Sequence, residues 1–141
     1  MKTYARRFVA VAGLVLLGSA ALVQAQSDTI TEVPFAFTVG TTPMARDTYR
    51  ISRLTGHVDA FLIKGDHSAA IVTSQPAGAS DSDNTPRLVF HRYGSQYFLR
   101  EVRLPDNRGF VLPQARTERE AASKLANGAR PDVVSLRGDS E

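Results

Sequence analysis

Apolar residues stand at every second position in several short runs of this sequence. The clearest run has Val33, Phe35, Phe37 and Val39 alternating with smaller or polar residues. This period of two predicts a half-buried strand, since successive side chains of a strand point to opposite faces. Pro34 has no N–H for a neighbouring strand, so this strand is predicted to lie at a sheet edge or to carry a bulge. The other predicted strands are residues 49–52, 58–64, 68–74, 87–93, 96–104, 110–112 and 133–136.

Many short strands and one late helix predict an all-β fold, either an antiparallel sandwich or a small barrel of about six to eight strands. The helix is expected over residues 113–127, because Pro113 suits a first helical turn and Asn127-Gly128 forms a stop. The β domain with this helix is expected to span residues 26–128. Residues 129–141 are left as a tail that contains the last short strand and ends in frayed residues.

Two tight turns are expected to join neighbouring strands into hairpins, at Gly65-Asp66 and at Gly94-Ser95. Residues 40–47 are predicted to form a turn, and the polar residues 75–86 are predicted to form a loop.

The first twenty-five residues have the three parts of a secretory signal peptide. Lys2, Arg6 and Arg7 give a positive start, residues 8–23 form an apolar middle, and small residues lead to Ala25. We expect cleavage after Ala25 and export to the periplasm or the medium. An uncleaved anchor is the alternative, although an apolar run of about sixteen residues is short for a bilayer span.

The charge balance changes once this leader is removed. The whole chain has 17 Lys+Arg against 14 Asp+Glu, and three of the cations lie in the leader. The mature chain is therefore formally neutral, which argues against nucleic-acid binding, since affinity for phosphates comes from an excess of cations. The sequence has no cysteine, so an exported domain has to rely on its hydrophobic core rather than on disulfides.

The segments Val33–Gly40 (VPFAFTVG) and Leu88–Leu99 (LVFHRYGSQYFL) carry a further signal. They resemble the signature segments of a family of small exported proteins from soil bacteria, and residues 113–121 resemble a third segment of that family. Residues 42–49 depart from the family's Leu-Pro-Ala-Gly-x-Tyr turn because they lack its glycine. The resemblance implies an exported β-rich protein and implies no particular activity.

The predicted hairpin around Gly94-Ser95 mixes cations with aromatic rings. In its register Arg92 faces Tyr97, so that the guanidinium would lie over the ring, and Leu88 faces Glu101. Such a surface suits an anionic or sugar-like ligand, or a protein partner. The alternative is ordinary cross-strand pairing that only stabilises the hairpin. The candidate ligand-binding residues are His91, Arg92, Tyr93, Tyr97 and Arg100.

Residues suited to metal binding or catalysis are few. His57 and Asp59 would share one strand face and supply two ligands, whereas zinc sites need three or four. His67 is expected at the far end of the same hairpin, too distant to add a ligand. The sequence has no Gly-x-Ser-x-Gly nucleophile motif, and nothing in it brings the carboxylates of Asp59, Asp66 and Glu101 together.

Two short motifs are predicted to be coincidences. Asp81–Asn84 resembles the start of a calcium loop but lacks the later glycine and glutamate. Arg137-Gly138-Asp139 matches a cell-adhesion tripeptide in the predicted tail. We therefore expect no enzyme activity, no cofactor and no metal.

The sequence predicts an exported, non-enzymatic β domain that binds a ligand or protein partner in the cell envelope. One alternative is a structural protein that associates with itself through an edge strand such as residues 33–39. Another is a hydrolase or metal-dependent enzyme that uses His91, or His57 with Asp59.

Overall fold

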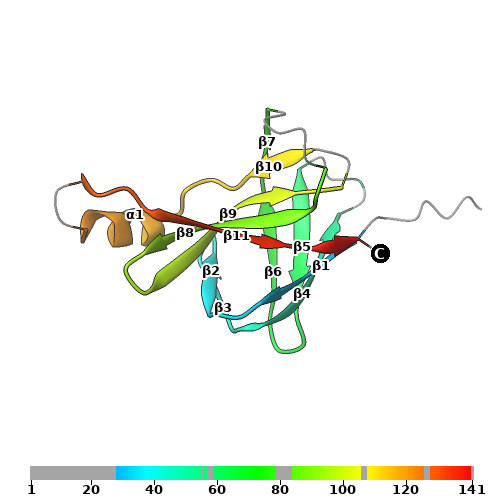
Figure 1. The fold of residues 1–141 in the computed structure, drawn as a ribbon, viewed down its shortest axis with the longest axis horizontal. Coiled ribbons are helices and arrows are strands. Elements are labelled where there is room, and N and C mark those ends of the chain that lie inside the picture. Colours follow the sequence, from blue (N-terminus) through cyan, green and yellow to red (C-terminus); the bar gives the residue numbers. More distant parts are fainter. Residues whose placement is uncertain are drawn as a thin grey trace, which may run out of the picture.

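The computed structural model of the protein describes residues 28–54, 56, 59–78, 84–105, 108–125 and 128–140. In this part of the chain two sheets of mainly antiparallel strands pack face to face, and one short helix lies beside them (Figure 1). The sheets are not closed into a barrel, so the predicted all-β class is confirmed in the form of a sandwich. The described residues form twelve strands rather than six to eight, because several are very short.

Sheet A has five strands, all paired antiparallel. In order across the sheet they are β12 (Asp139–Ser140), β1 (Thr29–Val33), β4 (Asp47–Arg53), β5 (Ala60–Lys64) and β6 (Ala69–Thr73).

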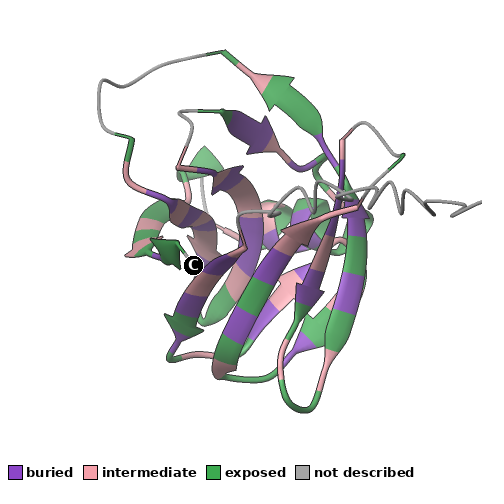
Figure 2. Cartoon of the chain, turned by 90° about the vertical axis from the view of Figure 1, so that its right-hand side faces the viewer, coloured by how far each residue is buried: buried purple, intermediate pink, exposed green. Residues whose placement is uncertain are grey.

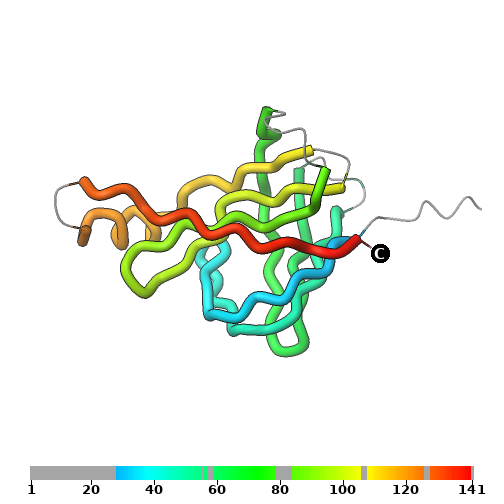
Figure 3. The backbone as a smooth tube through the Cα atoms, in the orientation of Figure 1, coloured from blue at the N-terminus to red at the C-terminus, as the bar shows by residue number. Residues whose placement is uncertain are grey.

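Sheet B has seven strands. Its main path is β11 (Asp132–Arg137), β8 (Arg87–Tyr93), β9 (Gln96–Arg103), β10 (Gly109–Val111) and β7 (Gln75–Ala77). Strand β2 (Phe37–Val39) pairs in parallel with β9 and antiparallel with β3 (Thr42–Met44). The β8–β9 hairpin extends beyond the sandwich toward the helix α1 (Arg116–Ser123), as the path of the chain in Figure 3 shows.

The described chain passes from one sheet to the other at four short connections. Strand β1 leads into β2 through residues 34–36, and β3 leads into β4 through residues 45–46. Farther along, β6 leads into β7 through Ser74, and β11 into β12 through Gly138. The single strand predicted over residues 33–39 is therefore wrong. It breaks at Pro34, and neither half is a sheet edge, because β1 lies between β12 and β4 and β2 lies between β3 and β9.

Several predicted boundaries also differ. The β5–β6 hairpin turns over four residues rather than two, and the N–H of Gly65 donates to the carbonyl of Ser68 at 2.8 Å. Strand β3 lies within the predicted turn 40–47, and β7 lies within the predicted loop 75–86. In both places a short strand containing proline pairs with the sheet on one side only.

The C-terminal part of the chain is more ordered than its sequence suggests. Helix α1 covers only Arg116–Ser123 of the predicted 113–127, because the backbone of Ala115 is still extended. Residues 129–141 were expected to end frayed, whereas β11 and β12 take up most of them. The predicted leader, residues 1–25, lies outside the described residues. Within the described ones, no helix has the length and apolar character needed to cross a bilayer.

Inward-facing side chains of both sheets form the main hydrophobic core, visible as buried stripes along the strands in Figure 2. A row of aromatic rings crosses it. Phe37 contacts Tyr49 of β4 and Phe90 of β8, each edge to face at 5.2 Å between ring centroids. Phe90 also contacts Phe35, which stacks on Tyr97 of β9 at 3.9 Å. Such contacts add about 0.5–1.5 kcal/mol each beyond burial, and they tie sheet A to sheet B without a disulfide.

Gly138 is predicted to be essential to the crossing between β11 and β12. A Cβ at this position would lie 2.5 Å from Thr29 Cγ2 and 2.5 Å from Thr31 Oγ1, both on buried side chains. We expect Gly138→Ala to lower the free energy of unfolding by about 1–3 kcal/mol, measured by denaturant titration. Gly78→Ala is the control, since its Cβ would meet nothing within 4 Å. Equal losses in the two variants would contradict this explanation.

Candidate functional site

The predicted ligand-binding residues lie on the β8–β9 hairpin, whose register is confirmed near the turn. His91 pairs with Phe98, and Arg92 pairs with Tyr97. Farther along, the predicted pairing of Leu88 with Glu101 is wrong, because the register shifts at a bulge between Val89 and Phe90. Opposite that shift, β9 has Arg100 as an extra residue.

Side-chain alternation divides the five predicted residues between the two faces of the hairpin. His91 and Tyr93 stand two positions apart on β8, so both point to the face that carries α1. Arg92 and Tyr97 point to the opposite face. Arg100 of β9 stands two positions after Phe98, which pairs with His91, so its side chain also points toward α1 and three of the five residues come together there.

The side chains of these three residues contact the carboxylate of Glu118, which α1 presents to this face of the hairpin. The Tyr93 hydroxyl donates to Glu118 Oε1 at 3.0 Å, and Arg100 Nη1 donates to Glu118 Oε2 at 2.9 Å. The Nδ1 atom of His91 lies 3.6 Å from Glu118 Oε1. Glu118 is only 2% exposed, so both of its carboxylate oxygens bind groups inside the protein rather than water.

A small apolar cluster surrounds this polar centre and attaches the helix to the hairpin. Tyr93 and Phe98 pack edge to face at 5.9 Å, and Ala121 of α1 is buried against them. Ala122 and Leu125 pack at the margin of the same cluster. The helix is thus fixed by a buried ion pair as well as by apolar contact.

The surroundings of His91 favour its neutral form. Burial lowers the pKa of His91 below the usual 6.5, and the charge of Arg100 lowers it further, while Glu118 and Glu101 act in the opposite direction. The nearby carboxylate would suggest a charged histidine. The effect of burial on the pKa of His91 is larger than that of the carboxylate, because Glu118 already has Arg100 as its cation.

On the opposite face, Arg92 and Tyr97 do not form the expected stacked pair. Arg92 Nε and Nη2 both donate to Asp132 Oδ2 of β11, at 3.2 and 2.5 Å. That hydrogen bond is the main reason why the pKa of Arg92 is raised above its usual value. The Tyr97 ring stacks on Phe35 instead, so it belongs to the core rather than to an open binding surface.

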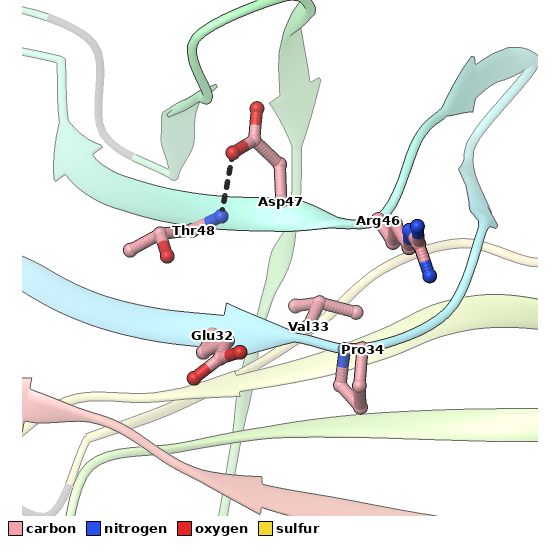
Figure 4. A pocket seen from close by; sticks show the side chains of 6 residues that line it. All are labelled: Glu32, Val33, Pro34, Arg46, Asp47 and Thr48. Atoms are coloured by element: carbon pink, nitrogen blue, oxygen red, sulfur yellow. Dashed lines mark hydrogen bonds between the residues drawn. The ribbon is translucent and has the colours of Figure 1, made fainter.

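A surface recess of about 380 Å³ lies at the end of β1 and the start of β4 (Figure 4). Its lining includes the exposed side chains of Glu32 and Arg46 together with the carboxylate of Asp47. Asp47 accepts the N–H groups of Thr48 at 2.8 Å and Asp66 at 2.9 Å, and the bond from Thr48 is the main cause of its lowered pKa. Asp47 therefore holds the β5–β6 turn in place, which explains its position without a ligand.

The carboxylates of Asp59, Asp66 and Glu101, which were considered for catalysis, lie apart in the structure. His57 lies outside the described residues, and the carbonyl of Asp59 accepts hydrogen bonds from Ser74 at the edge of the sandwich. Asp66 belongs to the β5–β6 turn and Glu101 to the other sheet. In the described ranges no group of three His, Cys, Asp or Glu side chains could hold a metal ion.

Of the two short motifs, residues 81–83 lie outside the described part. Arg137-Gly138-Asp139 joins β11 to β12 with Gly138 buried, so this tripeptide is part of the sandwich rather than of a frayed tail.

Glu118 is the one residue of this polar centre that was not among the five predicted ligand-binding residues. It stands three, four and seven positions before Ala121, Ala122 and Leu125, which places it on the apolar face of a helix. A charged residue on such a face indicates a buried partner, and the sequence contained that signal.

The comparisons with known proteins give no family. No protein-family model matches the chain, and no curated protein or solved structure matches it either. The resemblance of its segments to a family of small exported bacterial proteins stays a prediction.

Glu118 is predicted to hold α1 against the hairpin. Glu118→Ala leaves the guanidinium of Arg100 largely buried without its carboxylate, so we expect the free energy of unfolding to fall by about 3 kcal/mol in a denaturant titration. Glu120→Ala is the matched control on the same helix, because Glu120 forms only an exposed pair with Arg116. Glu120→Ala should lower the free energy of unfolding by less than about 0.5 kcal/mol. A loss no larger in Glu118→Ala would show that the buried ion pair does not hold the helix.

His91 is predicted to titrate below pH 6.5 in an NMR experiment on its imidazole, because burial disfavours its charged form. Between the two pKa values the folded protein binds fewer protons than the unfolded chain. The contribution of His91 to stability is therefore present above pH 6.5 and is lost as the pH falls toward the folded pKa. Glu118→Gln should lower the midpoint further, since it removes a charge that raises it. A midpoint above 6.5 in the wild type would mean that the carboxylate dominates.

Proposed function

We propose that this chain is an exported, non-enzymatic domain that binds a partner in the cell envelope through one side of the β8–β9 hairpin. We call this region the hairpin flank. It consists of four residues at the β11 edge of sheet B, with His91 and Val133 on the face that carries α1 and Arg92 and Asp132 on the opposite face. The four residues form two neighbouring cross-strand pairs, His91 with Val133 and Arg92 with Asp132.

The observation that carries the proposal is the exposure of Val133. Its side chain is 65% exposed, and in the described part of the chain only one other large apolar residue is exposed to this degree. Across the strand pair Val133 faces His91, whose side chain is 30% exposed. An apolar side chain next to an accessible imidazole is the kind of surface that protein partners bury.

The ion pair between Arg92 and Asp132 adds accessible charge on the opposite face of the same two strands. Their side chains are 42% and 66% exposed. An exposed ion pair stabilises a folded chain very little, because both groups are well hydrated. Its groups can therefore exchange their mutual contact for contacts with charged groups of a partner.

The buried cluster supports binding rather than catalysis. Both oxygens of Glu118 are engaged by Tyr93 and Arg100, so they serve to fix α1 on the hairpin. A rigid support of this kind lowers the entropy lost when a surface binds. In this proposal His91 and Arg92 contact the partner, while Tyr93, Tyr97 and Arg100 hold their positions.

Two alternatives remain from the sequence. Self-association is favoured by a separate observation, the uncharged edge of β6 in sheet A. An enzyme is the weaker alternative, because the imidazole of His91 would have to act beside a carboxylate that is closed to solvent. Export is part of the proposal, and the intact mass of protein from its native host should correspond to a chain without residues 1–25.

The test compares proteins crosslinked to the domain in the envelope of its host. Arg92→Ala and Val133→Lys should each reduce recovery of the specific partner by about tenfold, as expected for residues at the centre of an interface. Ile71→Lys is the matched control, since Ile71 is 69% exposed but lies on the other sheet. Unchanged recovery in the two hairpin-flank variants, or an equal loss in all three, would overturn the proposal.

A further inference from the structure

Strand β6 forms one edge of sheet A. It pairs with β5 on one side, and among the described strands none pairs with its other side. Its five residues contain no charge and no proline, and the sequence has no charged residue from Ser68 to Ser80. A regular, uncharged strand at the edge of a sheet is a template with which another strand can pair.

The other edge strands of the described chain carry features that discourage pairing. Strands β3 and β7 have three residues each, with Pro43 and Pro76 in their centres. Strand β12 has two residues and includes Asp139. Strand β11 is longer but has a charged residue at each end, Asp132 and Arg137. Only β6 among these edges lacks such a feature.

The hydrogen bonds at both ends of the β5–β6 hairpin determine which backbone groups of β6 point outward. Gly65 bonds to Ser68 at one end, and Ser74 bonds to Asp59 at the other. Because bonded and non-bonded pairs alternate in an antiparallel ladder, Ala70 and Val72 are the residues of β6 that bond to β5. The N–H and C=O groups that face away from β5 therefore belong to Ala69, Ile71 and Thr73.

The side chains of the same three residues lie on the outer face of the sheet, where the central one is unusually exposed. Ile71 is 69% exposed, and Leu62 stands directly opposite it on β5. Ala69 and Thr73 flank it with small, uncharged side chains. The outer face of the sheet thus carries an apolar pair, Leu62 and Ile71, directly beside the edge of β6.

We propose that the edge of β6 is an interface between two copies of this chain, joined antiparallel about a two-fold axis through Ile71. In this arrangement Ile71 faces Ile71 of the other copy, and Ala69 faces Thr73. The outward groups of each strand then meet their complements in about six hydrogen bonds. The five strands of sheet A continue into those of its copy.

A second copy fits this edge better than an unrelated strand, because the edge is complementary to itself. The two-fold axis brings no like charges together, since β6 has none. It also places the two Leu62–Ile71 pairs end to end, as one apolar stripe across both sheets. This interface goes beyond the proposed partner binding and does not depend on it, since the hairpin flank lies on sheet B.

Sedimentation of the exported protein over a range of concentrations tests the dimer. The wild type should shift from monomer to dimer as its concentration rises. Ile71→Lys should weaken the dimer by at least about tenfold, because it places two ammonium groups at the axis. Val133→Lys is the control and should dimerise like the wild type. A wild type that stays monomeric at every concentration, or a dimer unaffected by Ile71→Lys, would overturn the proposal.

The absence of cysteine from the sequence allows a second, geometric test. In a bonded antiparallel pair the two Cα atoms lie about 5.5 Å apart, within the range that a disulfide spans. Ile71→Cys should therefore form a covalent dimer under mild oxidation. Val133→Cys should not, although it is about as exposed. Equal crosslinking of the two variants would mean random collision and would refute the proposed register.

Discussion

The row of aromatic rings from Tyr49 to Tyr97 is the interaction on which the sandwich depends. The chain has no disulfide to hold its two sheets together, so their attachment has to come from packing. Phe37 stands at the middle of the row, in contact with a ring from each sheet. Phe35 closes one side of the core with an edge contact and a stacked contact. Both phenylalanines belong to the segment around Pro34 that crosses between the sheets.

Much of this arrangement could be predicted from the sequence, because alternation reports which residues face inward. The fold class, the strands around Phe61 and Phe90, and the hairpin register next to Gly94 followed from that pattern. The change of sheet at Pro34 and Ser74 could not be predicted in the same way. An alternating pattern has the same appearance whether a strand continues in one sheet or passes to another.

The candidate site was predicted in part for a related reason. Local spacing placed His91, Tyr93 and Arg100 on one hairpin, but their common partner, Glu118, lies in a helix that is distant in sequence. The bulge between Val89 and Phe90, which shifts the register of the hairpin beyond this site, is also invisible without the structure. With Glu118 in place, Tyr93 and Arg100 become internal supports, although both were expected to bind a ligand. The exposed side chains that remain available for binding then include those of the neighbouring residues on β11.

The pairing of β1 with β12 has a consequence for when this domain can fold. Ile30 lies opposite Asp139, about a hundred residues later in the chain. Sheet A therefore gains its last strand only after nearly all of the described chain has left the ribosome. Contacts this distant in sequence form slowly, because the intervening loop has to close first. Until that point the outer side of β1 has no partner strand, so the sandwich cannot be completed before synthesis is nearly finished.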